Sequence, residues 1–127
     1  MIYRRPPHRV LLVEDDDQSR DALQLILEQE GFDVQVARDG DEGVNLASSF
    51  LPDVIILDLV LPRLNGFDAA TLLKSEPTTS GIPLVAVTAS WLGSEGTRLR
   101  QIGFDAALRK PFTATALIDE LRKVLPH

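Results

Sequence analysis

A run of apolar residues that ends in a single acid constrains the fold of this chain more than any other feature. Residues 54–57 are Val-Ile-Ile-Leu, and Asp58 follows them directly. Because the run does not alternate with polar residues, both faces of this strand are expected to be buried, as in the centre of a parallel sheet. A carboxylate is unstable inside such a strand, so Asp58 is expected at its carboxyl end, and Pro62 prevents the strand from continuing. In open α/β sheets, ligands bind at the carboxyl ends of the strands.

Taken alone, Asp58 is also compatible with a simpler role, in which an acid at a strand end caps the next helix. The other strand ends favour the functional interpretation. Three further apolar strands run into polar side chains, which are Glu14 with Asp15, Thr88, and Lys110. The carboxyl ends of parallel strands lie on one edge of a sheet, so these groups are expected to converge on Asp58.

Strand and helix patterns alternate five times along the chain. Strands are expected over residues 10–13, 32–37, 54–58, 82–87 and 106–109. Helices are expected over residues 19–30, 42–50, 66–74, 94–102 and 113–125. Parallel neighbours need right-handed crossover helices, so the pattern predicts a doubly wound α/β sheet with helices on both faces. Residues 1–9 are expected to form a disordered lead and residues 10–125 a single domain, with no output domain attached.

Composition excludes several classes of protein. The chain has no cysteine, and its two histidines, His8 and His127, lie near the ends, which argues against thiol chemistry, a zinc site or a histidine dyad. A net charge of −6 argues against direct DNA binding. No apolar run is long enough to span a membrane, and no signal peptide precedes the first strand, so a cytoplasmic location is expected.

The polar strand ends supply the parts needed for phosphoryl transfer. The carboxylates of Glu14, Asp15 and Asp58 would repel one another, and a hard divalent cation such as Mg²⁺ would compensate their charge. Lys110 adds a fixed positive charge, and Thr88 adds a hydroxyl that can donate to an anion. A carboxylate can itself be the nucleophile, and Asp58 is the candidate for an aspartyl phosphate. This interpretation requires that Asp58 lie near the other groups and not be sealed from solvent.

With these motifs in view, the sequence resembles a two-component response-regulator receiver domain, similar to the chemotaxis regulator and to stand-alone receivers. The resemblance depends on four motifs in the order and spacing of that family, which are residues 10–16, residues 58–62 with Asn65-Gly66, residues 87–89, and residues 110–112. It implies a flavodoxin-like sheet of order 2-1-3-4-5. It also implies transfer of phosphate from a histidine kinase or a phosphotransfer domain to Asp58, which changes the affinity for a downstream protein partner.

The same resemblance assigns roles to individual residues. Asp15 would be a direct ligand of Mg²⁺, Glu14 would act mostly through water, and the carbonyl of Val60 would be a third protein ligand. Thr88 and Lys110 would be the switch hydroxyl and the lysine of the family, with a cis bond between Lys110 and Pro111. Family analogy also allows a monomer or a weak homodimer.

One position departs from the family pattern. The family usually has an aromatic residue three positions before the lysine, and this chain has Ala107 there. Signalling would then depend on movement of the loop of residues 88–91. Trp91 in that loop is a reporter of this movement, a partner contact, or an aromatic that covers the fourth helix.

Two other functions stay open. The first is a receiver fold that acts as a constitutive docking surface, which Ala107 favours. The second is a phosphohydrolase that resembles the haloacid dehalogenase family, which Val60 disfavours because those enzymes carry a second acid at that position. We expect a self-catalysed phosphoacceptor rather than an enzyme. A dinucleotide site is excluded because no Gly-rich loop follows the first strand.

Overall fold

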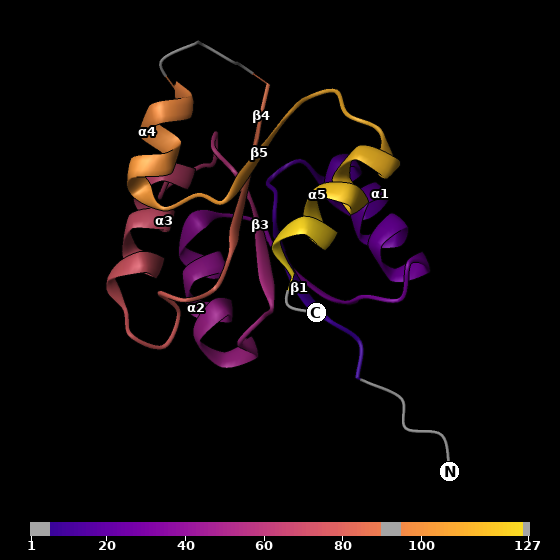
Figure 1. Ribbon diagram of the computed structural model, residues 1–127, viewed down its shortest axis with the longest axis horizontal. Coiled ribbons are helices and arrows are strands. Elements are labelled where there is room, and N and C mark those ends of the chain that lie inside the picture. The colour runs from indigo at the N-terminus through magenta and orange to yellow at the C-terminus, as the bar shows by residue number, and fades with distance from the viewer. Residues whose placement is uncertain (1–5, 90–94, 126–127) are drawn as a thin grey trace.

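The computed structural model describes residues 6–89 and 95–125, and strands alternate with helices through this part of the chain (Figure 1). The strands are β1 (Arg9–Val13), β2 (Asp33–Ala37), β3 (Val54–Asp58), β4 (Leu84–Thr88) and β5 (Ala106–Arg109). The helices are α1 (Asp17–Gln29), α2 (Gly40–Phe50), α3 (Gly66–Ser75), α4 (Glu95–Ile102) and α5 (Ala114–Val124).

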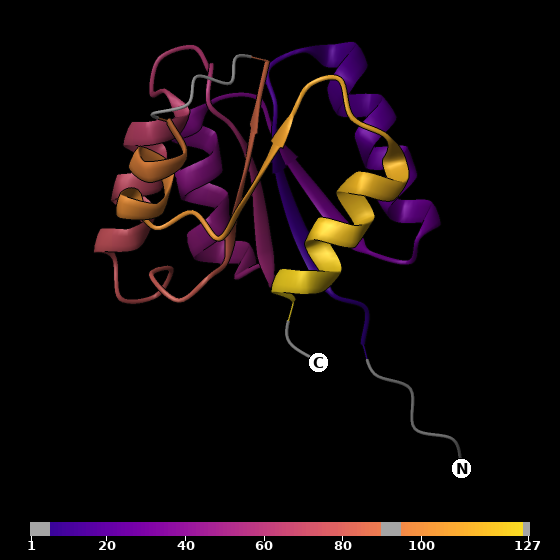
Figure 2. The ribbon, with the colours of Figure 1, turned by 45° about the horizontal axis from the view of Figure 1, so that its top comes forward.

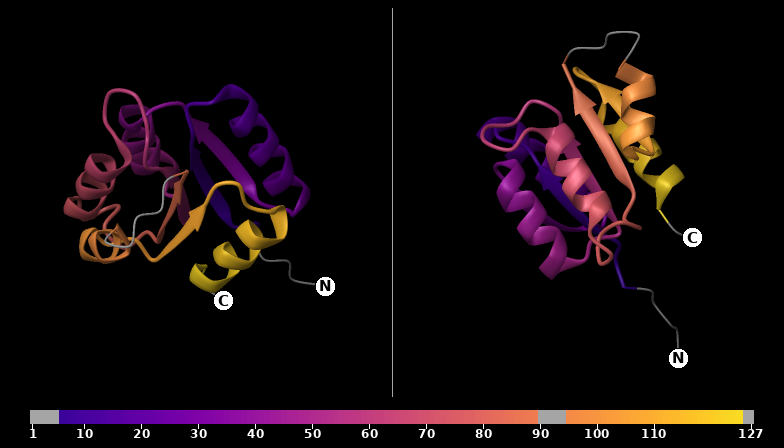
Figure 3. Two further views of the ribbon diagram at one scale, coloured as in Figure 1. Left: turned by 90° about the horizontal axis from the view of Figure 1, so that it is seen from above. Right: turned by 90° about the vertical axis from the view of Figure 1, so that its left-hand side faces the viewer.

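Within these described ranges, the five strands form one parallel sheet in the order β2-β1-β3-β4-β5. The first strand, β1, lies inside the sheet, and β2 forms one edge beside it. The strands β3, β4 and β5 then follow in order on the opposite side of β1. Helices α1 and α5 cover one face of the sheet, and α2, α3 and α4 cover the other (Figures 1 and 3). This arrangement confirms the predicted doubly wound fold and its strand order.

The alternation of side chains along each buried strand divides the core in two. In β1, Leu11 and Val13 pack under the α2–α4 layer, whereas Val10 and Leu12 pack under α1 and α5. All residues of β3 and β4 are buried, as expected for strands covered on both faces. Hydrophobic burial on both faces therefore fixes where the polar strand ends emerge.

No helix in residues 6–89 or 95–125 combines the length and apolar character that a membrane span needs.

The starts of the first two helices differ from the prediction. Helices α1 and α2 begin at Asp17 and Gly40, each two residues earlier than the apolar pattern indicated. The reason is the cap, because the side chains of Asp16 and Asp39 accept 2.8 Å hydrogen bonds from the backbone N–H groups of the third helical residues.

The first strand also begins earlier than predicted, one residue inside the segment predicted as a lead. The backbone N–H of Arg9 donates to Asp53 Oδ2 at 2.7 Å, and the carbonyl of His8 accepts from the N–H of Asp33 at 2.9 Å. These two bonds tie the start of β1 to its neighbours in the sheet.

Candidate functional site

The polar residues predicted at the strand ends lie on one edge of the sheet, which is the upper edge in Figure 2. The register pairs Val13 with Leu57, and Asp58 with Val87. Glu14 therefore follows the β1 residue beside Leu57, and Thr88 follows the β4 residue beside Asp58. Parallel pairing thus brings together residues that are far apart in the sequence, as predicted.

Three carboxylates form the centre of this edge. One carboxylate oxygen from each of Glu14, Asp15 and Asp58 lies within 4.8 Å of the other two. Glu14 and Asp58 are buried, whereas Asp15 is exposed. Oxygen donors of this kind, two recessed and one reaching solvent, suit a hard cation such as Mg²⁺ that keeps part of its water shell. The donor set therefore fits the predicted cation.

Lys110 reaches this cluster from beyond the end of β5. Its Nζ donates to Asp58 Oδ2 at 2.9 Å and to the two carboxylate oxygens of Glu14 at 3.2 and 3.3 Å. The other oxygen of Asp58, Oδ1, accepts a 3.0 Å hydrogen bond from the N–H of Val60. Both oxygens of Asp58 are thus held by donors, which fixes the orientation of its carboxylate.

The close carboxylates shift the protonation of the site. Burial raises the pKa of Glu14 from its ordinary value of 4.5 to about 8, and the hydrogen bond and charge of Asp58 add to the rise. Burial by itself would lower the pKa of Lys110, but the hydrogen bonds and charges of Asp58 and Glu14 outweigh it and raise that pKa. The contacts with the two buried acids therefore favour the charged form of Lys110.

Thr88 ends β4 and is buried beside the cluster. Its carbonyl accepts a 2.8 Å hydrogen bond from the backbone N–H of Lys110, which anchors the start of the β5–α5 loop. The peptide bond between Lys110 and Pro111 is cis, as the family resemblance implied. One backbone contact thus connects the two residues predicted to act on a bound anion.

The loop after β3 approaches Asp58 closely, and Gly66 makes this approach possible. The N–H of Gly66 donates to the carbonyl of Leu59 at 3.1 Å. A Cβ atom at Gly66 would lie 2.4 Å from the carbonyl oxygen of Asp58, so a side chain does not fit.

Helix α3 is capped by Asn65, whose Oδ1 accepts from the N–H of Asp68. The alternative in which Asp58 caps this helix is therefore wrong. Val60 is exposed in this loop, and the metal-binding role of its carbonyl stays a prediction.

The run of four acids at residues 14–17 has divided functions. Glu14 and Asp15 join the carboxylate cluster, whereas Asp16 caps α1 and Asp17 forms an ion pair with Arg20. The hydrogen bond from the backbone N–H of Ser19 lowers the pKa of Asp16. The helix-terminus explanation thus accounts for two of the four acids, and the site accounts for the other two.

Arg20 also belongs to this region, although no sequence motif pointed to it. Its side chain is only 6% exposed, and its guanidinium contacts the backbone of the acidic run. The available signal was a basic residue three positions after the last of four acids, which also fits an ordinary exposed ion pair on a helix.

A hollow lies beside Lys110, between α1 and the start of the β5–α5 loop. The hollow measures about 520 Å³ and is lined by Ser19, Ala22, Leu23, Ala89, Lys110, Pro111 and Phe112. The Lys110 side chain is 29% exposed and that of Asp58 is 7% exposed. Asp58 is therefore deeply placed without being sealed.

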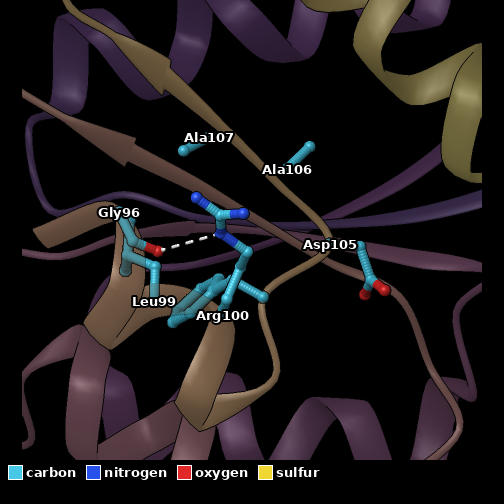
Figure 4. A pocket seen from close by; sticks show the side chains of 7 residues that line it. Gly96, Leu99, Arg100, Asp105, Ala106 and Ala107 are labelled. Atoms are coloured by element: carbon cyan, nitrogen blue, oxygen red, sulfur yellow. Dashed lines mark hydrogen bonds between the residues drawn. The ribbon is translucent and has the colours of Figure 1, made fainter.

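A second cavity lies beside Ala107, the position at which the family usually has an aromatic residue. It measures about 220 Å³ and lies between α4 and β5, where Leu99 and Phe104 form part of its wall and the Arg100 side chain extends across it (Figure 4). The small side chain of Ala107 leaves this space unfilled. The prediction for Trp91 lies outside the described residues.

Comparison with known proteins identifies the family. Residues 10–122 match the family model of the response regulator receiver domain. The chain is 35% identical over 119 residues to the response regulator MprA of Mycolicibacterium vanbaalenii. This match covers 94% of this chain and 51% of MprA. It is 30% identical to the polar-differentiation response regulator DivK of Brucella anthropi, over 94% of this chain and 97% of DivK. The chain thus spans about half the length of the first curated relatives it matches and nearly all of DivK.

Solved structures agree with this assignment. The chemotaxis protein CheY4 of Vibrio cholerae superimposes with a TM-score of 0.89 at 27% identity, over 94% of this chain and 99% of CheY4. The receiver domain of the sensor histidine kinase PA1611 from Pseudomonas aeruginosa superimposes with a TM-score of 0.85 at 28% identity, over 92% of this chain and 96% of that domain.

Proposed function

The chain belongs to the response regulator receiver domain family, and on that premise we propose that it accepts a phosphoryl group on Asp58. The donor would be the phosphohistidine of a sensor histidine kinase or of a phosphotransfer domain. The observation that supports Asp58 is its place at the end of the central buried strand, with one carboxylate oxygen held by Lys110 and the other by the N–H of Val60.

In this reaction, a carboxylate oxygen of Asp58 attacks the phosphorus atom of the phosphohistidine. A phosphorus–oxygen bond forms as the phosphorus–nitrogen bond breaks, and the imidazole leaves with the bonding electrons and takes up a proton. The ammonium of Lys110 is positioned to stabilise negative charge on the transferred group, and the hydroxyl of Thr88 is proposed to donate to one of its oxygens. The proposal treats the chain as a self-catalysed phosphoacceptor rather than an enzyme.

We propose that Glu14, Asp15, Asp58 and the carbonyl of Val60 hold Mg²⁺ in this site. A bound Mg²⁺ ion would neutralise charge on the phosphoryl oxygens during transfer. The three convergent carboxylates support this assignment. A further support is the similar PA1611 receiver domain, whose structure is described as having a magnesium ion coordinated in the active site cleft.

The proposed outcome of phosphorylation is a change in affinity for a downstream protein, without direct DNA binding by this chain. Ala107 and its adjacent cavity favour one alternative, in which phosphorylation occurs but does not change partner binding. Comparing the affinity for a candidate partner with and without phosphate on Asp58 separates the two functions. Equal affinities would leave a docking domain that phosphorylation does not control.

The acceptor role is tested with acetyl phosphate and Mg²⁺, followed by intact-mass measurement. We expect one phosphate adduct on the wild-type chain and none on Asp58→Asn. The matched control is Asp119→Asn, an exposed acid on α5, which should be phosphorylated like the wild type. An adduct that persists in Asp58→Asn would refute the assignment, and release of many phosphates per chain would instead indicate a phosphohydrolase.

A further inference from the structure

Arg20 is the only basic side chain that is buried among residues 6–89 and 95–125. A buried guanidinium is costly unless its donors are satisfied, so its partners indicate why it is tolerated. In this protein the partners are not the carboxylates of the site. They are the backbone and one side chain of the acidic run between β1 and α1.

Arg20 contacts three of the four acids in that run. Its NH1 donates to the carbonyl of Glu14 at 3.1 Å and to the carbonyl of Asp15 at 3.4 Å. Its NH2 pairs with Asp17 Oδ1. The planar fork of the guanidinium makes these contacts from two separate nitrogens, a span that the single nitrogen of a lysine ammonium does not have.

These contacts fix the backbone that carries the two acids of the site. The N–H of Glu14 donates to the carbonyl of Ala37 at 3.0 Å, and the side chain of Asp16 is held by the N–H of Ser19 at 2.8 Å. Asp15 lies between these two anchors, and Arg20 holds the carbonyl groups on both sides of it, those of Glu14 and of Asp15 itself. Arg20 thus contacts the backbone from which the exposed Asp15 carboxylate extends toward Glu14 and Asp58.

We propose that Arg20 is a positioning residue that holds the backbone of Glu14 and Asp15 so that their carboxylates converge with Asp58 into a cation site. This inference rests on the proposed function, since it concerns how tightly the same site binds Mg²⁺. Arg20 acts through the acidic run and contacts neither the cation nor the phosphoryl group.

Two effects of removing Arg20 oppose each other, so the choice of variant decides the test. Loss of its positive charge would favour a divalent cation, whereas loss of the backbone contacts would disfavour one. Arg20→Lys keeps the charge and removes the fork, so it isolates the positioning effect. The control is Arg122→Lys, which makes the same chemical change at an exposed arginine that pairs with Glu30.

The experiment titrates MgCl₂ into the metal-free proteins by isothermal titration calorimetry. We expect Arg20→Lys to bind Mg²⁺ about tenfold more weakly than the wild type, as is usual when a group that orients metal ligands is replaced. Arg122→Lys should bind as the wild type does. A purely structural role would lower the melting temperature of metal-free Arg20→Lys and leave its Mg²⁺ affinity unchanged, which would overturn the proposal.

A second measurement needs no metal. Amide hydrogen exchange in metal-free Arg20→Lys should be faster at residues 14–17 than in the wild type, with unchanged exchange in β3. Unchanged exchange at residues 14–17 would overturn the positioning role. If the wild type fails to bind Mg²⁺ while exchange at residues 14–17 still responds to Arg20→Lys, the proposed metal site fails and the positioning of the acidic run stands.

Discussion

Lys110 Nζ lies 2.9 Å from Asp58 Oδ2, although the two residues are 52 positions apart in the chain. The contact joins the end of the central strand β3 to the loop after the edge strand β5, across β4. The same ammonium also contacts both carboxylate oxygens of Glu14. One cation of the protein thus already neutralises part of the acidic cluster, and it competes with any further cation for the same oxygens.

This competition leads to a prediction for Lys110→Met. Removing the ammonium frees the carboxylates of Asp58 and Glu14, so Mg²⁺ affinity should rise about tenfold, equivalent to about 1.4 kcal/mol. Phosphorylation by acetyl phosphate should nevertheless slow, because the charge that stabilises the transferred group is lost. Calorimetry and intact-mass kinetics measure the two effects, and Lys123→Met on the exposed side of α5 is the control. Weaker Mg²⁺ binding in Lys110→Met would contradict the competition.

The raised pKa of Glu14 predicts how stability depends on pH in the absence of metal. Because this pKa is about 8 in the folded protein against an ordinary 4.5, the folded chain keeps a proton that the unfolded chain releases between these values. The stabilisation from this group is complete below pH 4.5 and is lost as the pH rises toward 8. Urea denaturation of wild type and Glu14→Gln across this range tests it, and the variant should show the flatter decline. Parallel curves would count against the shifted pKa.

Gly66→Ala should destabilise the protein by about 1–3 kcal/mol, the usual range for forced overpacking. The added Cβ would lie 2.4 Å from the Asp58 carbonyl oxygen and 2.6 Å from the Leu59 Cα atom, both of them backbone atoms. Gly81→Ala is the matched control, since its Cβ would meet no atom within 4 Å, and its effect should stay within about 0.5 kcal/mol. Chemical denaturation gives both values, and equal effects of the two substitutions would show that the close approach at Asp58 is not maintained in solution.

Thr79→Val should cost about 1–3 kcal/mol, because it leaves a buried carbonyl without a donor. The carbonyl of Leu73 near the end of α3 would ordinarily accept from the residue four positions later, which is Pro77 and has no N–H. The hydroxyl of the buried Thr79 supplies this donor at 2.7 Å. Thr78→Val, at the exposed neighbour, should change the free energy of unfolding by less than about 0.5 kcal/mol. The prediction fails if the two valine variants unfold at the same denaturant concentration.

Much of the fold was accessible from the sequence because burial leaves a strong local pattern. The uninterrupted apolar runs of β1, β3 and β4 could only belong to strands covered on both faces, and each run stops at a polar residue. The helix starts were less accessible, because Asp16 and Asp39 extend α1 and α2 by capping rather than by apolar spacing. A run of four acids gave no local sign of which members cap the helix and which join the site.

The sequence by itself determined that polar groups gather at one edge of a parallel sheet, because side-chain hydrophobicity and chain direction together fix where each strand emerges. It did not determine the partners of those groups. Only the tertiary structure places Arg20 on the carbonyls of Glu14 and Asp15 and leaves Lys110 to the carboxylates of Glu14 and Asp58. The physical reason is that hydrogen bonds and ion pairs depend on distances of a few ångströms, which the packing of helices on the sheet sets and the order of residues does not record.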